Sequence, residues 1–212
     1  AFVMSCSESL VTRSRAVQLS THELGHTLGM SHAASRDFGG EAVGPLGAAG
    51  SVSDYGDTHS TMGSWNLGFY ASSHAANTLA WLANGSSYQT VESAGTYVIA
   101  NYEARGGATR ALKVRRGTGN DAWLWIESRQ NTGIYSSQLD PSLYGGALIH
   151  LQDSMTSHKS HLLDFTPATS SFADAALAAG QTWTDPYSIV SVTVNSVTAG
   201  ARNVWIHFHW AG

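Results

Sequence analysis

The chain has 212 residues, of which 42% are hydrophobic and 12% are charged, and its formal net charge is −4. Its 11 Lys and Arg residues against 15 Asp and Glu residues form no basic stripe for nucleic acid, and no apolar run approaches the roughly 18–20 residues of a membrane span. Seven Trp and eight Tyr residues supply enough core for one or two folded domains, which excludes a disordered chain.

The N-terminal residues carry few signals. A short strand is predicted at Phe2-Val3-Met4, and the segment lacks the charged region and the length of a signal peptide, as is typical of mature or truncated material. The single Cys6 cannot form an internal disulfide, so cysteine usage does not identify the redox compartment.

Residues 15–29 are predicted to form a helix that carries two metal ligands. His22 and His26 stand one turn apart on one face at about 3.6 residues per turn, so both imidazoles can reach a single ion. Gly29 ends the helix because glycine tolerates a positive φ, and the returning chain can present His32 as a third ligand. We therefore expect one zinc ion with three imidazole ligands and a fourth position open to water.

Glu23 follows the first of these histidines and is the candidate general base. A three-histidine zinc site lowers the pKa of its bound water towards about 7, and the carboxylate could take the proton as the water attacks a peptide carbonyl. Structural zinc is one alternative, although such sites are usually four-coordinate and rich in Cys. A chance match on an ordinary helix is the other alternative, against which Gly29 and His32 argue.

The opposite face of the predicted helix is apolar. Val17, Leu24 and Leu28 follow one another at spacings of seven and four residues, which is typical of a stripe that packs on a sheet. We therefore expect this stripe to be buried.

A second motif follows a segment that is rich in Gly, Ala and Ser. Residues 36–57 are predicted to form a long loop, which leads to Ser60-Thr61-Met62-Gly63. The pattern H-E-x-x-H-x-x-G-x-x-H at residues 22–32, followed by this methionine turn, resembles the metzincin clan of zinc endopeptidases. The wider string from Tyr55 to Gly63 resembles the gametolysin-type branch of that clan.

The metzincin resemblance implies roles for two further positions. Met62 matches the methionine that lies as an apolar floor under the metal-binding imidazoles. Several branches place a tyrosine two residues later, but that position holds Ser64 here. The donor that would stabilise the oxyanion is therefore unassigned: Tyr55, His59 and Tyr70 are near in sequence, and a packing or surface role is the more common one for each.

The resemblance also bears on the chain before the helix. Metzincin catalytic domains usually place a twisted sheet and a further helix there, whereas 21 residues precede His22. Either a separate N-terminal segment or chain completes the catalytic domain, or this subdomain is reduced. Residues 71–82 have a helical pattern that resembles the closing helix of such a domain, and Asn84-Gly85 predicts its end.

From residue 86 onward the hydrophobic period changes from that of a helix to that of strands. Trp123 and Trp125 share one strand face and could form a sugar platform, although packing within the sheet is more common for such residues. Segments 146–151, 162–167 and 172–177 resemble the β-rich region that follows the catalytic domain in gametolysin-like bacterial proteins. The six predicted strands are Tyr97–Ala100, Ala111–Val114, Trp123–Ile126, Ala147–Leu151, Ile189–Val197 and Val204–Trp210.

The sequence thus predicts an α+β protein in two parts. Residues 1–85 would be the metzincin-type catalytic portion, which could be truncated at its N-terminus, and residues 86–212 an antiparallel β-sandwich. The predicted function is that of a secreted zinc metalloendopeptidase acting on a polypeptide substrate, with no nucleic-acid or membrane partner. The alternative is a protein- or glycan-binding β-module attached to an incomplete or inactive zinc site. Calcium is compatible with such a family, but no Asp-rich loop supports a calcium site.

Overall fold

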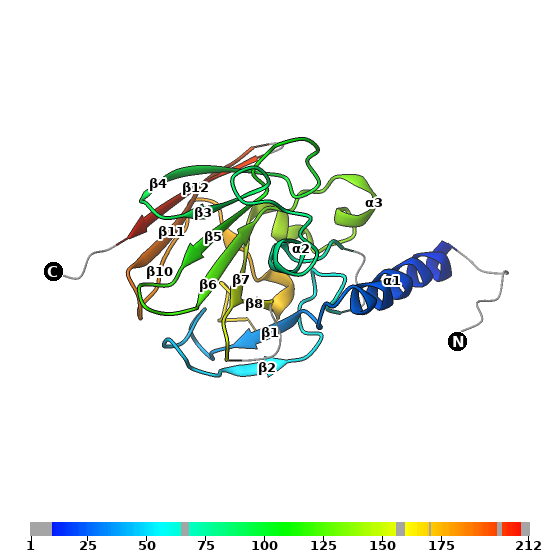
Figure 1. Ribbon diagram of the computed structural model, residues 1–212, viewed down its shortest axis with the longest axis horizontal. Helices are drawn as coiled ribbons and strands as arrows, with labels where there is room; N and C mark the ends of the chain where they lie inside the picture. Colours follow the sequence, from blue (N-terminus) through cyan, green and yellow to red (C-terminus); the bar gives the residue numbers. More distant parts are fainter. Residues whose placement is uncertain (1–9, 65–67, 156–159, 170, 199–200, 209–212) are drawn as a thin grey trace.

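The computed structural model describes residues 10–64, 68–155, 160–169, 171–198 and 201–208. The fold is α+β and mostly β (Figure 1). The predicted strand at Phe2-Val3-Met4 and Cys6 lie outside the described residues. In the part that the structure describes, no helix is long and apolar enough to cross a bilayer.

The helices are few, and only one of them is long. Helix α1 (Leu10–Thr27) begins before the predicted start near Arg15, and α2 (Ser72–Asn77) and α3 (Gly133–Ser136) are short. Two 3-10 turns, η1 (Pro141–Gly145) and η2 (Phe172–Asp174), complete the helical elements. The strands are β1 (Ala34–Asp37), β2 (Ser51–Ser53), β3 (Tyr88–Val91), β4 (Gly95–Ala100), β5 (Ala111–Arg115), β6 (Trp123–Glu127), β7 (Gly146–Gln152), β8 (His161–Leu162), β9 (Leu177–Ala178), β10 (Thr182–Thr184), β11 (Val190–Thr198) and β12 (Ala201–Phe208).

The larger sheet has eight strands in the order β2-β1-β8-β7-β6-β5-β3, with β9 pairing on β7. The smaller sheet has four strands in the order β10-β11-β12-β4, and all of its neighbours are antiparallel. The expectation of purely antiparallel strands is wrong for the larger sheet, because β3 pairs with β5 and β1 pairs with β8 in parallel. After β3 the chain crosses to the smaller sheet as β4 before it returns as β5, which gives β3 and β5 the same direction.

The inner faces of the two sheets share one core. Alternate residues of each strand point to the same face, and the inward ones are mainly Val, Leu and Ile. The fully or almost fully buried members of this core are Val91, Leu112, Val114, Leu124, Ile126, Ala147, Ile149, Leu151 and Leu177 of the larger sheet, and Ile99, Val190, Val192 and Val194 of the smaller one. All six predicted strands are confirmed as elements, although residues 209–210 of the last one lie outside the described residues. The short β1, β2, β3, β8, β9 and β10 were not predicted.

The larger sheet joins the two parts that the sequence separates at residue 85. Strands β1 and β2 come from the first part, and Ala34 and Ser35 pair with His161 and Leu162 of β8 from the second. The division into residues 1–85 and 86–212 stays a prediction, but its two parts share one sheet.

Two expectations about the first 85 residues are wrong. The segment 36–57 is not a continuous loop, because β1 and β2 form an antiparallel hairpin with Ser35 opposite Ser53. The helix expected over residues 71–82 ends at Asn77, because Thr78 and Leu79 both donate to the carbonyl of His74 and Ala80 then takes a positive φ of 54°.

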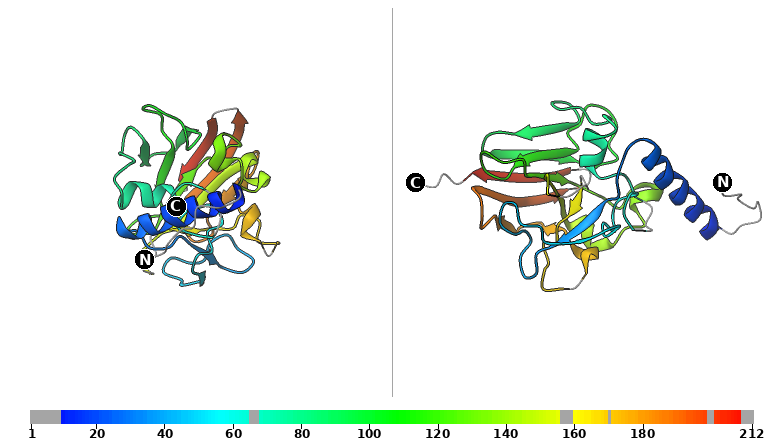
Figure 2. Two further views of the ribbon diagram at one scale, coloured as in Figure 1. Left: turned by 90° about the vertical axis from the view of Figure 1, so that its right-hand side faces the viewer. Right: turned by 60° about the horizontal axis from the view of Figure 1, so that its bottom comes forward.

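The apolar stripe on α1 is exposed, contrary to the expectation that it packs on a sheet. Val17, Leu24 and Leu28 are 44%, 52% and 43% exposed. In Figure 1 and in the right-hand view of Figure 2, α1 extends away from the two sheets and meets the rest of the molecule near its C-terminal end. Most of α1 therefore lies beyond the two sheets, which leaves its apolar stripe exposed.

Candidate metal centre

The structure brings together the three histidines that the sequence selects. His22 and His26 lie on α1, and His32 lies in the segment between α1 and β1. One ring nitrogen of each histidine lies within 4.8 Å of those of the other two. Among the described residues, no other group of three His, Cys, Asp or Glu side chains is close enough to hold one ion.

Gly29 shapes the return of the chain, as predicted. Its φ is +91°, a conformation that glycine adopts without a steric penalty. The amide of Met30 donates to the carbonyl of Gly25 at 3.0 Å, and that of Gly29 to the carbonyl of His26 at 3.0 Å. These two bonds are the Schellman motif that commonly ends a helix, and they direct the chain towards His32.

Each of the three imidazoles is held through the same nitrogen. His22 Nδ1 donates to the carbonyl of Thr61 at 2.8 Å, and His26 Nδ1 to that of Met30 at 2.9 Å. His32 Nδ1 donates to the Asp54 carboxylate at 2.9 Å. A proton on Nδ1 leaves the Nε2 lone pair of each neutral ring free, which is the tautomer and the type of outer partner that metal-bound histidines use.

Met62 lies beneath the helix that carries two of these rings. Its side chain is fully buried in a small apolar cluster with Met30 and Ala33. A Cβ placed on Gly25 would overlap the sulfur of Met62, so the thioether contacts α1 between His22 and His26. The apolar floor under the imidazoles, which the metzincin resemblance implies for Met62, stays a prediction.

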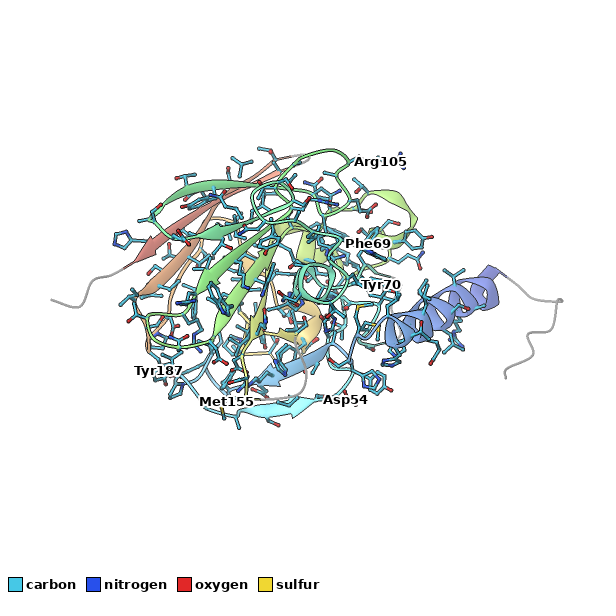
Figure 3. All side chains as sticks on the ribbon, viewed as in Figure 1. Asp54, Phe69, Tyr70, Arg105, Met155 and Tyr187 are labelled. Atoms are coloured by element: carbon cyan, nitrogen blue, oxygen red, sulfur yellow. The ribbon has the colours of Figure 1, made fainter. Side chains whose placement is uncertain are left out.

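Further polar contacts attach α1 to the segment around Met62. The side-chain amide of Gln18 donates to the carbonyl of Ser64 at 3.2 Å. The hydroxyl of Tyr70, which Figure 3 labels beside α1, donates to the carbonyl of Thr21 at 2.7 Å. Together with the hydrogen bond from His22 to the carbonyl of Thr61, these contacts hold α1 against the segment around Met62.

A cavity of about 420 Å³ opens beside the histidines. Glu23 is exposed and lines it together with His22 and Tyr55. The cavity also has apolar and amide surface from Leu19, Gln18 and Gly63. An extended chain placed here would lie beside both the candidate base and the candidate metal ligands.

The structure separates the three residues considered for the oxyanion donor. The ring of Tyr55 packs against that of His32 in a tilted arrangement, with the ring centroids 3.6 Å apart. Tyr70 donates its hydroxyl to Thr21, and His59 is buried with its Nε2 atom 3.0 Å from the carbonyl of Phe172. Burial lowers the pKa of His59, although Asp57 opposes that change. Of the three, Tyr55 alone contacts the candidate metal ligands.

Buried charges anchor the segment that leads to Met62. Asp57 and His150 are both fully buried and lie 2.9 Å apart. Burial alone would raise the pKa of Asp57, but the charges of His150 and His59 and their hydrogen bonds to Asp57 together lower that pKa below its usual 3.8. Burial also opposes the charge on His150, but the charges of Asp57 and Glu127 and the hydrogen bond to Asp57 together raise the pKa of His150 above 6.5. The backbone carbonyl of Asp57 accepts from Ser64, so this pair connects the segment to β7.

Asp54 is the site residue that the sequence did not reveal. Carboxylate partners of histidine have no fixed spacing, and the position of Asp54 became clear only with the β1–β2 hairpin, which brings the residue after β2 close to the segment that precedes β1. Figure 3 shows Asp54 beside the end of β2, on the side from which α1 extends.

Trp123 and Trp125 do not form an open platform, because Trp125 is fully buried and donates its indole N–H to Gln152 at 2.7 Å.

No protein-family model, curated protein or solved structure matches this chain. The resemblance to metzincins therefore rests on residues 22–32 and 55–63. The donor set agrees with a zinc ion, since borderline-soft Zn²⁺ favours imidazole nitrogen and accepts three histidines in catalytic sites. An oxygen-seeking ion such as Ca²⁺ takes about six to eight oxygen ligands, and the three donors that lie together here are all imidazoles.

Proposed function

We propose that the protein is a secreted zinc metalloendopeptidase of the metzincin type, related to the gametolysin branch. The observation that carries the proposal is the matched orientation of His22, His26 and His32, each with its Nδ1 atom bonded to an oxygen and its Nε2 atom free. Glu23 in the adjoining cavity and Met62 beneath α1 support the same function. In this proposal α1 is the active-site helix and the two sheets form a β-sandwich next to it.

The chemistry divides between the metal and the chain. His22, His26 and His32 would hold the ion, which when bound would supply Lewis-acid polarisation of the scissile carbonyl. Glu23 takes a proton from the attacking water and returns it to the leaving amine. The free Nε2 atoms need no rearrangement before binding, because their Nδ1 partners already orient the rings. No covalent acyl intermediate and no second nucleophile are required.

The substrate would be a polypeptide that passes through the cavity beside Glu23. Its walls combine Leu19 and Tyr55 with the side-chain amide of Gln18, so they can accept an apolar side chain next to the peptide group.

A second partner would cover α1. The exposed stripe of Val17, Leu24 and Leu28 supports a further N-terminal segment or a separate chain that packs on this face, since scattered apolar residues are common on surfaces but an aligned stripe is not.

The same exposed stripe favours one alternative function. If the partner of α1 is required for activity, the chain by itself would be a protein- or glycan-binding β-module with an incomplete zinc site. Zinc would then bind without hydrolysis.

The test combines metal content with hydrolysis of unfolded casein. We expect one zinc per chain, hydrolysis that a chelator abolishes and added zinc restores, and a loss of about 10²–10⁴-fold in Glu23→Gln, which keeps its zinc. Glu92→Gln, an exposed acid on the β3–β4 turn, is the matched control and should change nothing. A chain that binds no zinc would overturn the proposal, and a chain that binds zinc without hydrolysis would establish the alternative.

A further inference from the structure

We propose that the turn Ser53–Gly56 is built to position His32, and that Tyr55 is the positioning residue. This inference rests on the proposed zinc site and goes beyond its ligands. Tyr55 would hold the His32 ring by packing against its face, and Asp54 would hold it by accepting the hydrogen bond from Nδ1. Two neighbouring residues of one turn would thus fix both the plane and the rotation of the His32 ring.

The backbone of this turn is strained at Tyr55. The amide of Gly56 donates to the carbonyl of Ser53 at 3.0 Å, which closes a four-residue turn with Tyr55 in its third position. The φ angle of Tyr55 is +60°. Turns with a positive φ at that position prefer Gly or Asn, and a bulky residue there is disfavoured. Such strain persists only where the surroundings impose it, and it is often found at functional sites.

The neighbours of the turn leave it little freedom. A Cβ on Gly56 would overlap the hydroxyl of Ser35 on β1, so the backbone lies directly against the hairpin. The amide of Asp57 donates to the carbonyl of Ala33 at 3.2 Å. The turn is therefore attached to β1 and to the residue that follows His32.

The strained conformation places the ring of Tyr55 on the candidate ligands. Its centroid is 3.6 Å from that of His32, at an interplanar angle of 34°. It is also 5.7 Å from that of His22, with the two planes only 15° apart. The Asp54 carboxylate meanwhile receives His32 Nδ1 at 2.9 Å. Rotation of the His32 ring would break both contacts, so the turn keeps its Nε2 atom directed towards the other two histidines.

Packing does not explain why a tyrosine occupies this position. The residue is 45% exposed, and it belongs to none of the buried apolar clusters of the described residues. Its contacts are with ligand rings, where ordering before the metal arrives would raise affinity. A residue kept only for folding would stabilise the metal-free protein, whereas a strained positioning residue would not.

The experiment therefore measures two quantities in Tyr55→Gly. Glycine removes the strain and the ring together, so we expect the metal-free protein to unfold at the same temperature or a higher one. We expect its zinc affinity to fall about 10-fold or more, as for other outer partners of metal ligands. The affinity is measured by competition with a chromophoric chelator, and no catalytic assay is needed. Tyr55→Phe keeps the ring and should keep the zinc affinity.

Ala80→Gly is the matched control. Ala80 is the other non-glycine residue with a positive φ, at 54°, among the described residues, and it is exposed. This variant should raise the unfolding temperature without changing the zinc affinity. A zinc affinity within about twofold of the unmodified chain in Tyr55→Gly, or a lower unfolding temperature of its metal-free form, would overturn the inference. Failure of the unmodified chain to bind zinc would instead refute the zinc site itself, and this inference with it.

Discussion

The two-sheet core and the candidate metal centre are stabilised in different ways. Leu124 and Ile126 of the core are completely buried, and the non-directional gain from burying such side chains stabilises the scaffold. At the metal centre the histidine rings remain partly exposed and are held by directed bonds to Thr61, Met30 and Asp54. The free energy gained by burial changes little when a side chain shifts slightly, whereas metal binding depends on the positions of the ligand atoms. We therefore expect substitutions in the core mainly to lower the free energy of unfolding, and substitutions at the candidate metal centre mainly to lower the zinc affinity.

The largest effect on stability is expected from the buried charges beneath the core. Glu127 is fully buried and accepts two bonds from Arg129, at 2.9 and 2.6 Å, and one from the amide of Ser72 at 2.7 Å. Glu127→Gln removes the carboxylate charge that pairs with the buried guanidinium of Arg129, which should lower the free energy of unfolding by about 3–5 kcal/mol. Chemical denaturation measures this loss. The exposed Glu92→Gln should cost almost nothing, and an equal loss in both variants would contradict the argument.

One substitution at two leucines tests the comparison most directly. Leu124→Ala in the core should lower the free energy of unfolding by about 2–5 kcal/mol through lost burial and a cavity. Leu24→Ala on α1 should change it by less than about 0.5 kcal/mol, because Leu24 is 52% exposed. If Leu24→Ala costs as much as Leu124→Ala, a partner must already cover the stripe of α1 in solution, for example a second copy of the chain.

Gly25→Ala connects the two regions, because two effects of opposite sign compete. Alanine at an exposed helix position would stabilise the helix by about 1 kcal/mol relative to glycine. Here the new methyl group overlaps the sulfur of the buried Met62, and overpacking of this kind costs about 1–3 kcal/mol. We expect a net loss of stability and weaker zinc binding.

The control is a double-mutant cycle. The double variant Gly25→Ala with Met62→Ala should recover part of the stability that Gly25→Ala loses, because the smaller side chain makes room for the methyl group. Strictly additive effects of the two substitutions would mean that Met62 does not form the floor of the site.

The three histidines of the candidate metal centre could be grouped from the sequence because their geometry is local. The spacing of His22 and His26 and the glycine at position 29 depend on one helix and its end. The strands from β4 onward that the sequence predicted were long enough to show a period of two. Strands of two to four residues such as β8 and β1 are too short for that, and their pairing depends on residues more than a hundred positions apart.

The failure at α1 has a different cause. An apolar stripe at helical spacing predicts that something covers it, but not where that cover lies in the chain. For Val17, Leu24 and Leu28 the described residues do not provide it. Asp54 could not be predicted from the sequence either, because its contact with His32 depends on the register of a hairpin whose strands were predicted to be loop.

The smallest predicted effect is a pH dependence that belongs to the scaffold. The raised pKa of His150 stabilises the fold fully below its ordinary value of 6.5, and this stabilisation is lost as the pH rises through the folded-state pKa. The lowered pKa of Asp57 acts in the opposite sense: its contribution is present above 3.8 and is lost as the pH falls. The pair should therefore stabilise the protein most between about pH 4 and 6.5.

The measurement is the free energy of unfolding of the metal-free chain and of His150→Gln from pH 4 to 9. The residues of the candidate metal centre are the same in both proteins, so the difference between them reports the buried pair of Asp57 and His150. The charged neighbours Glu127 and Arg129 act on His150 in opposite directions, and they stay in place in both proteins. We expect the advantage of the unmodified chain to shrink above pH 6.5. A constant difference over that range would mean that Asp57 does not hold His150 charged, and that the segment before Met62 is attached to β7 by a neutral hydrogen bond.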